Sequence, residues 1–221
     1  MENKSKNKSQ LNFENARLNM VNNQLRKRNI RDKDILHAIS NIPRHMFVPE
    51  ELTAQAYDDN PLPIGYGQTI SQPFIVASMT QNLNVNKNHK ILEIGTGCGY
   101  QTAMLAELAN EVFTVEIIKS HSKSAKHILD KLQYTNIQFK VGNGGLGWLE
   151  HAPYDRIIVT AAAPQIPPQL IEQLSEGGIM VIPVGEPHAL VQNLLKVHKN
   201  NGILIQTSLY AVRFVPLVDT Y

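Results

Sequence analysis

The sequence predicts an α/β protein built on a doubly wound, mostly parallel sheet. From residue 90 onward, short apolar runs rich in β-branched residues alternate with helical repeats, which is the pattern of parallel strands joined by crossover helices. A glycine-rich turn follows the first of these strands, and a helical pattern follows the turn. The last two strands flank Asn201-Gly202, a dipeptide typical of tight hairpin turns, so we expect them to pair antiparallel.

Residues before the sheet are expected to form a helical extension and an ordered loop. Residues 1–10 are polar and rich in lysine, which predicts a disordered tail. Leu11 to about Ile30 places apolar residues at near-helical spacing, and Asp32 could cap a second helix that ends before Pro43. The stretch from Pro49 to Pro73 holds prolines and glycines with little helical pattern. Long loops of this kind in compact domains are often functional.

We expect residues 11–221 to form one domain. Its cofactor-binding α/β core is expected in residues 89–221, and residues 11–88 contribute the N-terminal helices and the substrate loop. A chain of 221 residues is long enough to bury a full core. In chain order, the expected elements are a strand at KILEI (90–94), a helix from Tyr100 to Leu108, a strand at VFTVE (112–116), a helix from Ser120 to Leu132, strands at IQFKV (137–141) and RIIVTA (156–161), a helix around Gln169 to Leu174, a strand at IMVIPV (179–184), and hairpin strands at 190–197 and 203–212.

Composition argues against several classes of protein. The formal net charge is +2, and no basic helix or basic-aromatic alternation is present, so we expect no nucleic-acid partner. No apolar run approaches the roughly 20 residues of a membrane span, and the polar start is unlike a signal peptide, which predicts a cytoplasmic protein. The single cysteine, Cys98, excludes an internal disulfide framework, and the histidines lack metal-ligand spacing, so no metal is expected.

The run ILEIGTGCGY, residues 91–100, is the most informative segment. Its glycines permit positive φ and leave the backbone bare, so a ligand can approach the amides that open the next helix. The third glycine comes one residue earlier than in the dinucleotide fingerprint, and Tyr100 stands where that fingerprint needs a small residue. This spacing disfavours NAD. An ordinary strand-to-helix turn is the alternative for such a segment alone.

Two glutamates at successive strand ends indicate the ligand. Glu93, beside the turn, would repel a pyrophosphate but favour a positively charged cofactor such as S-adenosyl-L-methionine. Glu116 lies about 20 residues after the first glycine, the offset at which a carboxylate binds ribose hydroxyls. We therefore expect S-adenosyl-L-methionine as the cofactor, with Cys98 an inert member of its turn rather than a catalytic thiol. The turn residues expected to contact the cofactor are Gly95, Thr96, Gly97, Cys98 and Gly99.

Six runs, one of them the glycine turn itself, match one protein family. They are IPRHMFVP (42–49), LPIGYGQTISQP (62–73), EIGTGCGYQ (93–101), APYDRIIVTAAAPQIP (152–167), GGIMVIPVG (177–185) and VRFVPL (212–217). GQTISQP and VRFVPL are specific to that family. Through them the chain resembles the protein-L-isoaspartate O-methyltransferases, which have the Rossmann-like fold of class I methyltransferases. The resemblance implies methyl transfer from S-adenosyl-L-methionine to the free α-carboxylate of L-isoaspartyl residues in damaged proteins and peptides, which initiates repair through a succinimide. It implies no stable protein partner.

The resemblance also implies site residues. Ser71 matches the serine of the family's active site; the alternative is that its hydroxyl caps a helix starting near Pro73. Arg213 could neutralise a carboxylate or be a plain surface charge. The residues expected to contact the substrate are Gln68, Thr69, Val212, Arg213 and Phe214.

One position departs from the family pattern. After the strand at 137–141 the family carries Gly-Asp-Gly, whose aspartate accepts a hydrogen bond from the adenine amine, whereas this chain has Gly142-Asn143-Gly144. Asn143 and Gly144 are still expected to contact the cofactor, with the neutral amide oxygen of Asn143 as acceptor. Trp148 could border the adenine or lie at the edge of the core.

Three other functions stay open at this stage. The chain could methylate a small molecule or a nucleic acid, although AAAPQIPP after the strand at 156–161 lacks the Asn/Asp-Pro-Pro-aromatic run that would hold a planar base. It could be an NAD-dependent oxidoreductase, which the glycine spacing and Glu93 disfavour. It could also be a binding module that has lost activity, because Asn143 falls inside the expected cofactor site.

Overall fold

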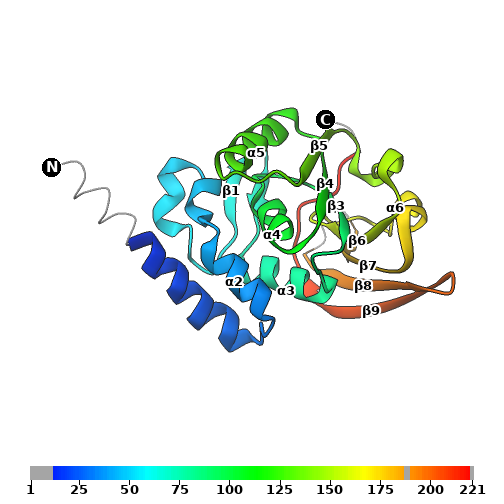
Figure 1. Cartoon of the computed structure of the whole chain (residues 1–221), viewed down its shortest axis with the longest axis horizontal. Helices are drawn as coiled ribbons and strands as arrows, with labels where there is room; N and C mark the ends of the chain where they lie inside the picture. The colour runs from blue at the N-terminus through cyan, green and yellow to red at the C-terminus, as the bar shows by residue number, and fades with distance from the viewer. Residues whose placement is uncertain (1–11, 187–189, 220–221) are drawn as a thin grey trace.

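A seven-stranded sheet forms the centre of the computed structural model, which describes residues 12–186 and 190–219 (Figure 1). Its strand order is β5-β4-β3-β6-β7-β8-β9. The first five strands in this order, from β5 to β7, pair parallel with their neighbours. Strand β8 pairs antiparallel with both β7 and β9, and the whole arrangement confirms the predicted fold class. The tail expected at residues 1–10 lies outside the described residues. The strands are β3 (Lys90–Ile94), β4 (Glu111–Glu116), β5 (Ile137–Val141), β6 (Tyr154–Val159), β7 (Leu174–Val184), β8 (Gln192–Asn200) and β9 (Ile203–Val212).

The order of strands reverses at β3. This strand pairs with β4 on one side and with β6 on the other, so the crossovers leave it in opposite directions. In doubly wound sheets, ligands bind outside the carboxyl ends of the strands at this reversal. The fold therefore places a ligand site beside the ends of β3, β4 and β6.

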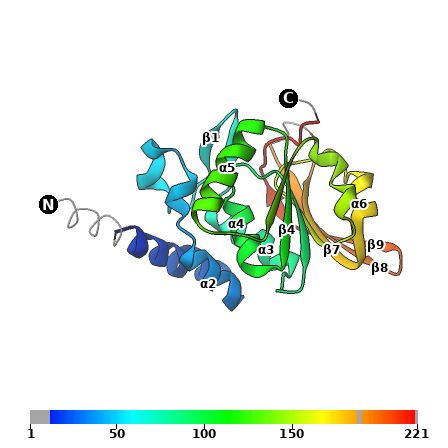
Figure 2. The same ribbon diagram turned by 45° about the horizontal axis from the view of Figure 1, so that its top comes forward.

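Helices cover both faces of the sheet, and alternate side chains of each strand meet them. Figure 2 shows α4 and α5 on one side and α6 on the other. Ile91 and Val112 pack toward the side of α3 and α4, whereas their neighbours Leu92 and Phe113 pack toward α6. The near-continuous burial of these strands explains their apolar sequences. The helices are α3 (Pro73–Leu83), α4 (Tyr100–Leu108), α5 (Lys119–Lys131) and α6 (Pro168–Gln173).

The N-terminal extension is helical, as predicted, over its described part. Residues 12–20 form an α-helix that continues through a π-helical turn, η1 (Val21–Leu25), and a 3-10 turn, η2 (Arg26–Arg28). The next helix, α2 (Lys33–Asn41), begins after Asp32, whose carboxylate accepts hydrogen bonds from the amides of residues 34 and 35. Both helices bury apolar side chains against the core that α3 and α4 share. Among the described residues, no helix is long and apolar enough to cross a membrane.

The segment expected to be a loop is more regular than its sequence indicates. It contains the 3-10 helix η4 (Glu50–Gln55) and a hairpin of β1 (Leu62–Gly65) and β2 (Gln68–Ile70). The hairpin turn, Gly65-Tyr66-Gly67, has positive φ at all three residues. Another 3-10 helix, η3 (Arg44–Phe47), precedes this segment. The hairpin is short and interrupted by proline, so the alternation that signals a strand is absent from its sequence.

Candidate active site

A cavity opens where the strand order reverses. Its walls come from the hairpin β1–β2, the glycine turn after β3, the end of β4, and residues 215–218 near the end of the chain. Segments far apart in the sequence thus meet at the edge of the sheet where a ligand is expected. The predicted site residues that line this cavity are Gln68, Thr69, Ser71, Gly95, Thr96, Gly97, Cys98, Glu116 and Gly144.

The glycine turn needs its glycines. Gly95, Gly97 and Gly99 have φ of 95°, 53° and 91°, a region that side chains other than glycine rarely adopt. A Cβ atom at Gly95 would also collide with the hydroxyl of Thr160. Gly99 lies behind the turn, where it precedes α4 and packs against α5, and it does not line the cavity. The turn therefore lines the cavity with residues 95–98, and its backbone is bare at the two glycines, Gly95 and Gly97.

Glu116 is held with its carboxylate at the cavity wall. One oxygen, Oε2, accepts a hydrogen bond from the amide of Gly97 at 2.8 Å, and Oε1 accepts one from the amide of Ile118 at 2.8 Å. The residue is only 6% exposed. Each oxygen keeps a further lone pair for a ligand. This arrangement ties the glycine turn to the end of β4 and presents a fixed acceptor, which fits a ribose diol.

Glu93 lies behind the glycine turn rather than on the cavity wall. Its carboxylate is fully buried, and Oε2 accepts hydrogen bonds from the hydroxyls of Thr102 at 2.6 Å and Thr114 at 2.7 Å. Because Thr114 donates its proton to Glu93, the 2.6 Å bond between Thr114 and Thr96 has Thr96 as donor. Burial raises the pKa of Glu93 to about 8. The chain of bonds anchors Thr96, so Glu93 supports the turn from below.

Ser71 lies at the junction of the cavity with a second depression, which we call the groove. The groove has a mixed lining whose apolar part includes Phe74, Tyr210 and Phe214, and Ser71 is on the wall of both depressions. Helix α3 begins after Gln72 and receives no side-chain cap, so the alternative role of Ser71 as a helix cap is wrong. The hydroxyl is therefore placed where a ligand of the cavity and a ligand of the groove would meet.

The groove also gathers the predicted residues near the end of the chain. Val212, Arg213 and Phe214 all line it. Among the described lining residues, the charged side chains are Arg213, which is exposed, and Arg28. Arg28 lies 3.5 Å over the ring of Phe74 and is ion-paired with Asp59. A partly apolar groove edged by arginines fits an extended peptide that carries a carboxylate.

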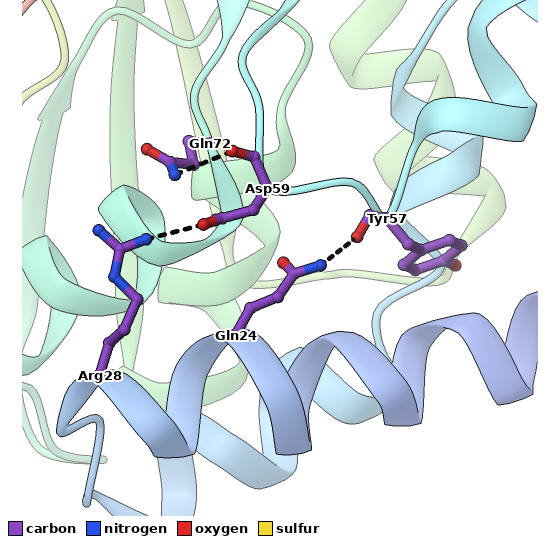
Figure 3. Close-up of polar contacts among 5 residues, drawn as sticks. All are labelled: Gln24, Arg28, Tyr57, Asp59 and Gln72. Carbon is purple, nitrogen blue, oxygen red and sulfur yellow. Dashed lines mark hydrogen bonds and ion pairs between the residues drawn. The ribbon is translucent and has the colours of Figure 1, made fainter.

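Two side-chain contacts hold the N-terminal helix to the segment that leads to Ser71, and a third braces that segment internally (Figure 3). Gln24 donates to the carbonyl of Tyr57 at 2.8 Å, and Arg28 contacts the Asp59 carboxylate at 2.8 Å. Gln72 then donates to the carbonyl of Asp59 at 2.9 Å. Sequence reasoning missed these contacts, because partners that are 13 to 33 positions apart leave no local signal.

Asn143 shapes the turn beside the cavity but is not on its wall. Its side-chain oxygen accepts a hydrogen bond from the amide of Gly145 at 2.8 Å and so caps the 3-10 turn η5 (Gly144–Leu146). Gly144 lines the cavity, and a Cβ there would collide with Ile94. Trp148 lies at the edge of the core, edge-on to Phe113 with ring centroids 5.6 Å apart, as one of its two interpretations predicts. No cluster of metal-binding side chains occurs in the part of the chain that is described.

Replacing Asn143 by aspartate is expected to leave binding of S-adenosylmethionine at least as tight as in the encoded protein. One carboxylate oxygen can keep the bond from Gly145, and the other places a negative charge next to Gly144 on the cavity wall, where it would favour the adenine amine. In the encoded protein the oxygen is already engaged and the remaining amide group donates. Titration calorimetry of both proteins measures the effect. Weaker binding by the variant would show that this turn has adapted to a neutral side chain.

The fold and the cavity together define a class I, S-adenosylmethionine-dependent methyltransferase. Residues 15–221 match the family model of protein-L-isoaspartate(D-aspartate) O-methyltransferase (PCMT). The chain belongs to this family.

Individual relatives agree with that assignment. The chain is 51% identical over 212 residues to a protein-L-isoaspartate O-methyltransferase of Syntrophus aciditrophicus, covering 95% of this chain and 96% of the relative. It is 55% identical over 197 residues to one of Dictyoglomus thermophilum, covering 89% of each. Among solved structures, a beta-aspartate methyltransferase (PCMT) from Plasmodium falciparum in complex with S-adenosyl-L-homocysteine is similar with a TM-score of 0.81 and 26% identity, covering 92% of this chain and 99% of that one.

Proposed function

We propose that the cavity and the groove are the donor and acceptor halves of one methyl-transfer site that meets at Ser71. The activity is S-adenosylmethionine-dependent methylation of L-isoaspartyl residues in damaged proteins. The observation that supports this placement is that Ser71 lines both depressions, together with Thr69, Thr160 and Val215. Because these walls come from both halves of the chain, residues 11–88 and 89–221 would act as one domain.

The cavity would hold the cofactor through backbone and one carboxylate. Glu116 would accept hydrogen bonds from the ribose hydroxyls, while residues 95–98 of the glycine turn and Gly144 would border the nucleoside. When bound, S-adenosylmethionine supplies an electrophilic methyl group on a positively charged sulfur. Glu93 and Asn143 would contribute through the turns that they hold.

The substrate carboxylate needs orientation rather than activation. A carboxylic acid with a pKa near 4 is ionised at neutral pH, so the nucleophile requires no general base. Ser71 would donate a hydrogen bond to one carboxylate oxygen and so aim the other at the cavity. Proximity and fixed dipoles then supply the rate enhancement.

The groove would hold the peptide on either side of the damaged residue. Its mixed lining and the run Val212–Phe214 fit an extended chain with both apolar and polar groups. Broad tolerance of peptide sequence is expected, because damage sites share a linkage rather than a side chain. We expect neither nucleic acid nor a stable protein as a further partner. The cytoplasmic location expected from the sequence is part of this proposal.

Methyl transfer to a matched pair of peptides tests the proposed site. We expect base-labile methyl esters on an L-isoaspartyl peptide and little labelling of the same peptide with a normal aspartyl linkage. Radiolabelled S-adenosylmethionine provides the measurement. Equal labelling of both peptides would contradict the specificity, and no labelling despite intact cofactor binding would favour the binding-module alternative.

Replacing Ser71 by alanine is expected to lower kcat about 10- to 100-fold, because the carboxylate loses a hydrogen bond that orients it. The affinity for S-adenosylmethionine should change less than about twofold, since the hydroxyl acts on the acceptor side. Steady-state kinetics and calorimetry separate the two effects. Ser40→Ala, at a half-buried serine whose hydroxyl donates to the carbonyl of His37 in its own helix, is the matched control. Collapse of cofactor binding with normal turnover at saturation would contradict this role.

A further inference from the structure

Arg44 is a fully buried cation beneath the proposed site. It begins the 3-10 helix η3 within the run IPRHMFVP, and none of its surface is exposed. Among the residues that the structure describes, no carboxylate lies within ion-pair distance of its guanidinium. Two backbone carbonyls bind it instead: Nε donates to Ala56 at 2.7 Å and Nη2 donates to Ser71 at 2.9 Å. The third nitrogen, Nη1, has no hydrogen-bond partner.

A buried guanidinium without a carboxylate is costly to the fold. Arginine cannot escape the cost by losing its proton, and a buried charge is normally paired. The carbonyl oxygens and the face of Tyr100, whose ring centroid is 4.7 Å from Cζ, compensate only part of the lost hydration. Arg156 shows the contrast: it also binds two carbonyls, those of Asn84 and Asp155, but it does so beside the Asp155 carboxylate and away from the cavity.

The charge of Arg44 lies directly behind the wall where the cavity and the groove meet. Ser71, which it binds, lines both depressions, and Tyr100, over which it stacks, lines the cavity. The other arginines of the groove are placed differently. Arg28 is ion-paired with Asp59, and Arg213 is exposed, so solvent screens its charge. Arg44 is the one of these three arginines whose charge is neither neutralised by a carboxylate nor screened by solvent.

We propose that Arg44 is a positioning residue whose missing counter-ion is the α-carboxylate of the substrate. It fixes the backbone of Ser71, and its buried charge attracts the carboxylate that the Ser71 hydroxyl orients. The inference rests on the proposed function, since it takes an isoaspartyl peptide as the ligand of the groove. It predicts that the preference for an anionic over a neutral ligand depends on the charge at position 44.

Two peptides that differ only in this charge provide the test. One carries the isoaspartyl α-carboxylate, and the other carries an α-carboxamide at the same β-linked residue. Their dissociation constants are measured by calorimetry with S-adenosylhomocysteine at saturation, for the full chain, Arg44→Met, Arg44→Lys and the control Arg156→Met. The ratio of the two constants reports the charge preference, and a merely structural role would not change this ratio.

We expect Arg44→Met to reduce the carboxylate preference about 10- to 100-fold, as loss of a nearby buried charge predicts, while Arg156→Met leaves it unchanged. Arg44→Lys should keep most of the preference but lower kcat, because the charge stays while the two-pronged hold on Ser71 and Ala56 is lost. Equal weakening of both peptides by Arg44→Met, or no weakening, would overturn the inference.

Controls separate misfolding and failure of the proposed function from failure of this inference. Binding of S-adenosylhomocysteine and a cooperative thermal transition establish that each variant is folded. If Arg44→Met does not fold, the inference is tested with Arg44→Lys instead. Loss of the carboxylate preference in that variant overturns the inference. If the encoded protein itself does not prefer the isoaspartyl to the aspartyl peptide, the proposed function fails instead.

Discussion

Replacing Glu116 by alanine is expected to weaken the binding of S-adenosylmethionine by about 1 to 3 kcal/mol, or roughly 5- to 150-fold. The ribose hydroxyls would lose a charged acceptor. The amides of Gly97 and Ile118 would also lose their partner, so the glycine turn would no longer be tied to the end of β4. Titration calorimetry with S-adenosylmethionine and with S-adenosylhomocysteine measures the loss, and both ligands should lose affinity because they share the ribose.

Two further variants make that result specific. Glu116→Gln keeps one oxygen acceptor but no charge, so its affinity should lie between those of the encoded protein and the alanine variant. Glu111→Ala removes a glutamate at the opposite end of the same strand, far from the cavity wall, and should bind normally. An affinity unchanged by Glu116→Ala would mean that β4 does not end at the ribose.

Local sequence patterns were sufficient to predict most of the strands and helices of the sheet region. Helix α4 spans Tyr100–Leu108 as predicted, because a glycine turn before it and a strand after it leave one place for a helix. The hairpin of β8 and β9 follows from Asn201-Gly202. The start of β7 did not follow in the same way: its strand begins at Leu174, where the preceding helix was expected to end. Where a helical pattern runs directly into a strand pattern, the sequence leaves the boundary between the two elements ambiguous.

The directions in which the site side chains point could not be predicted from the sequence. Glu93 stands at the strand end where a ligand contact was expected, yet its carboxylate points to Thr102 and Thr114 behind the turn. Asn143 uses its oxygen to cap a turn rather than to face the cavity. A pattern of residue types places a side chain along an element, whereas its direction depends on neighbours from other elements.

The contacts that organise the groove depend even more on tertiary structure. Arg44 binds the carbonyl of Ser71, which is 27 residues away, and Arg28 pairs with Asp59 across 31 residues. The sequence marks Arg44 only as part of a matching run and marks Arg28 not at all. Both become meaningful once the extension folds against the hairpin β1–β2 and helix α3.

The stability of this protein is expected to fall as pH rises from about 5 to 8, because of Glu93. Burial raises the pKa of its carboxyl from 4.5 to about 8 in the folded state. Within this window the folded protein retains a proton that the unfolded chain releases, so unfolding becomes more favourable as pH increases. The effect is complete above about pH 8, and its size is on the order of 3 to 5 kcal/mol. Glu93→Gln, which resembles the protonated acid, should lack this slope.

Urea denaturation of both proteins across this pH range isolates the contribution of Glu93, because other titrating groups cancel in the difference. The free energy of unfolding of Glu93→Gln minus that of the encoded protein should rise with pH and then level off. The amide nitrogen would replace Oε1, which has no hydrogen-bond partner, so the variant could start below the encoded protein at pH 5. The decisive quantity is therefore the slope. Glu150→Gln, at an exposed glutamate, should give a flat difference. Parallel curves for Glu93→Gln would show that the carboxylate is already ionised in the fold and that the threonine hydroxyls alone stabilise its charge.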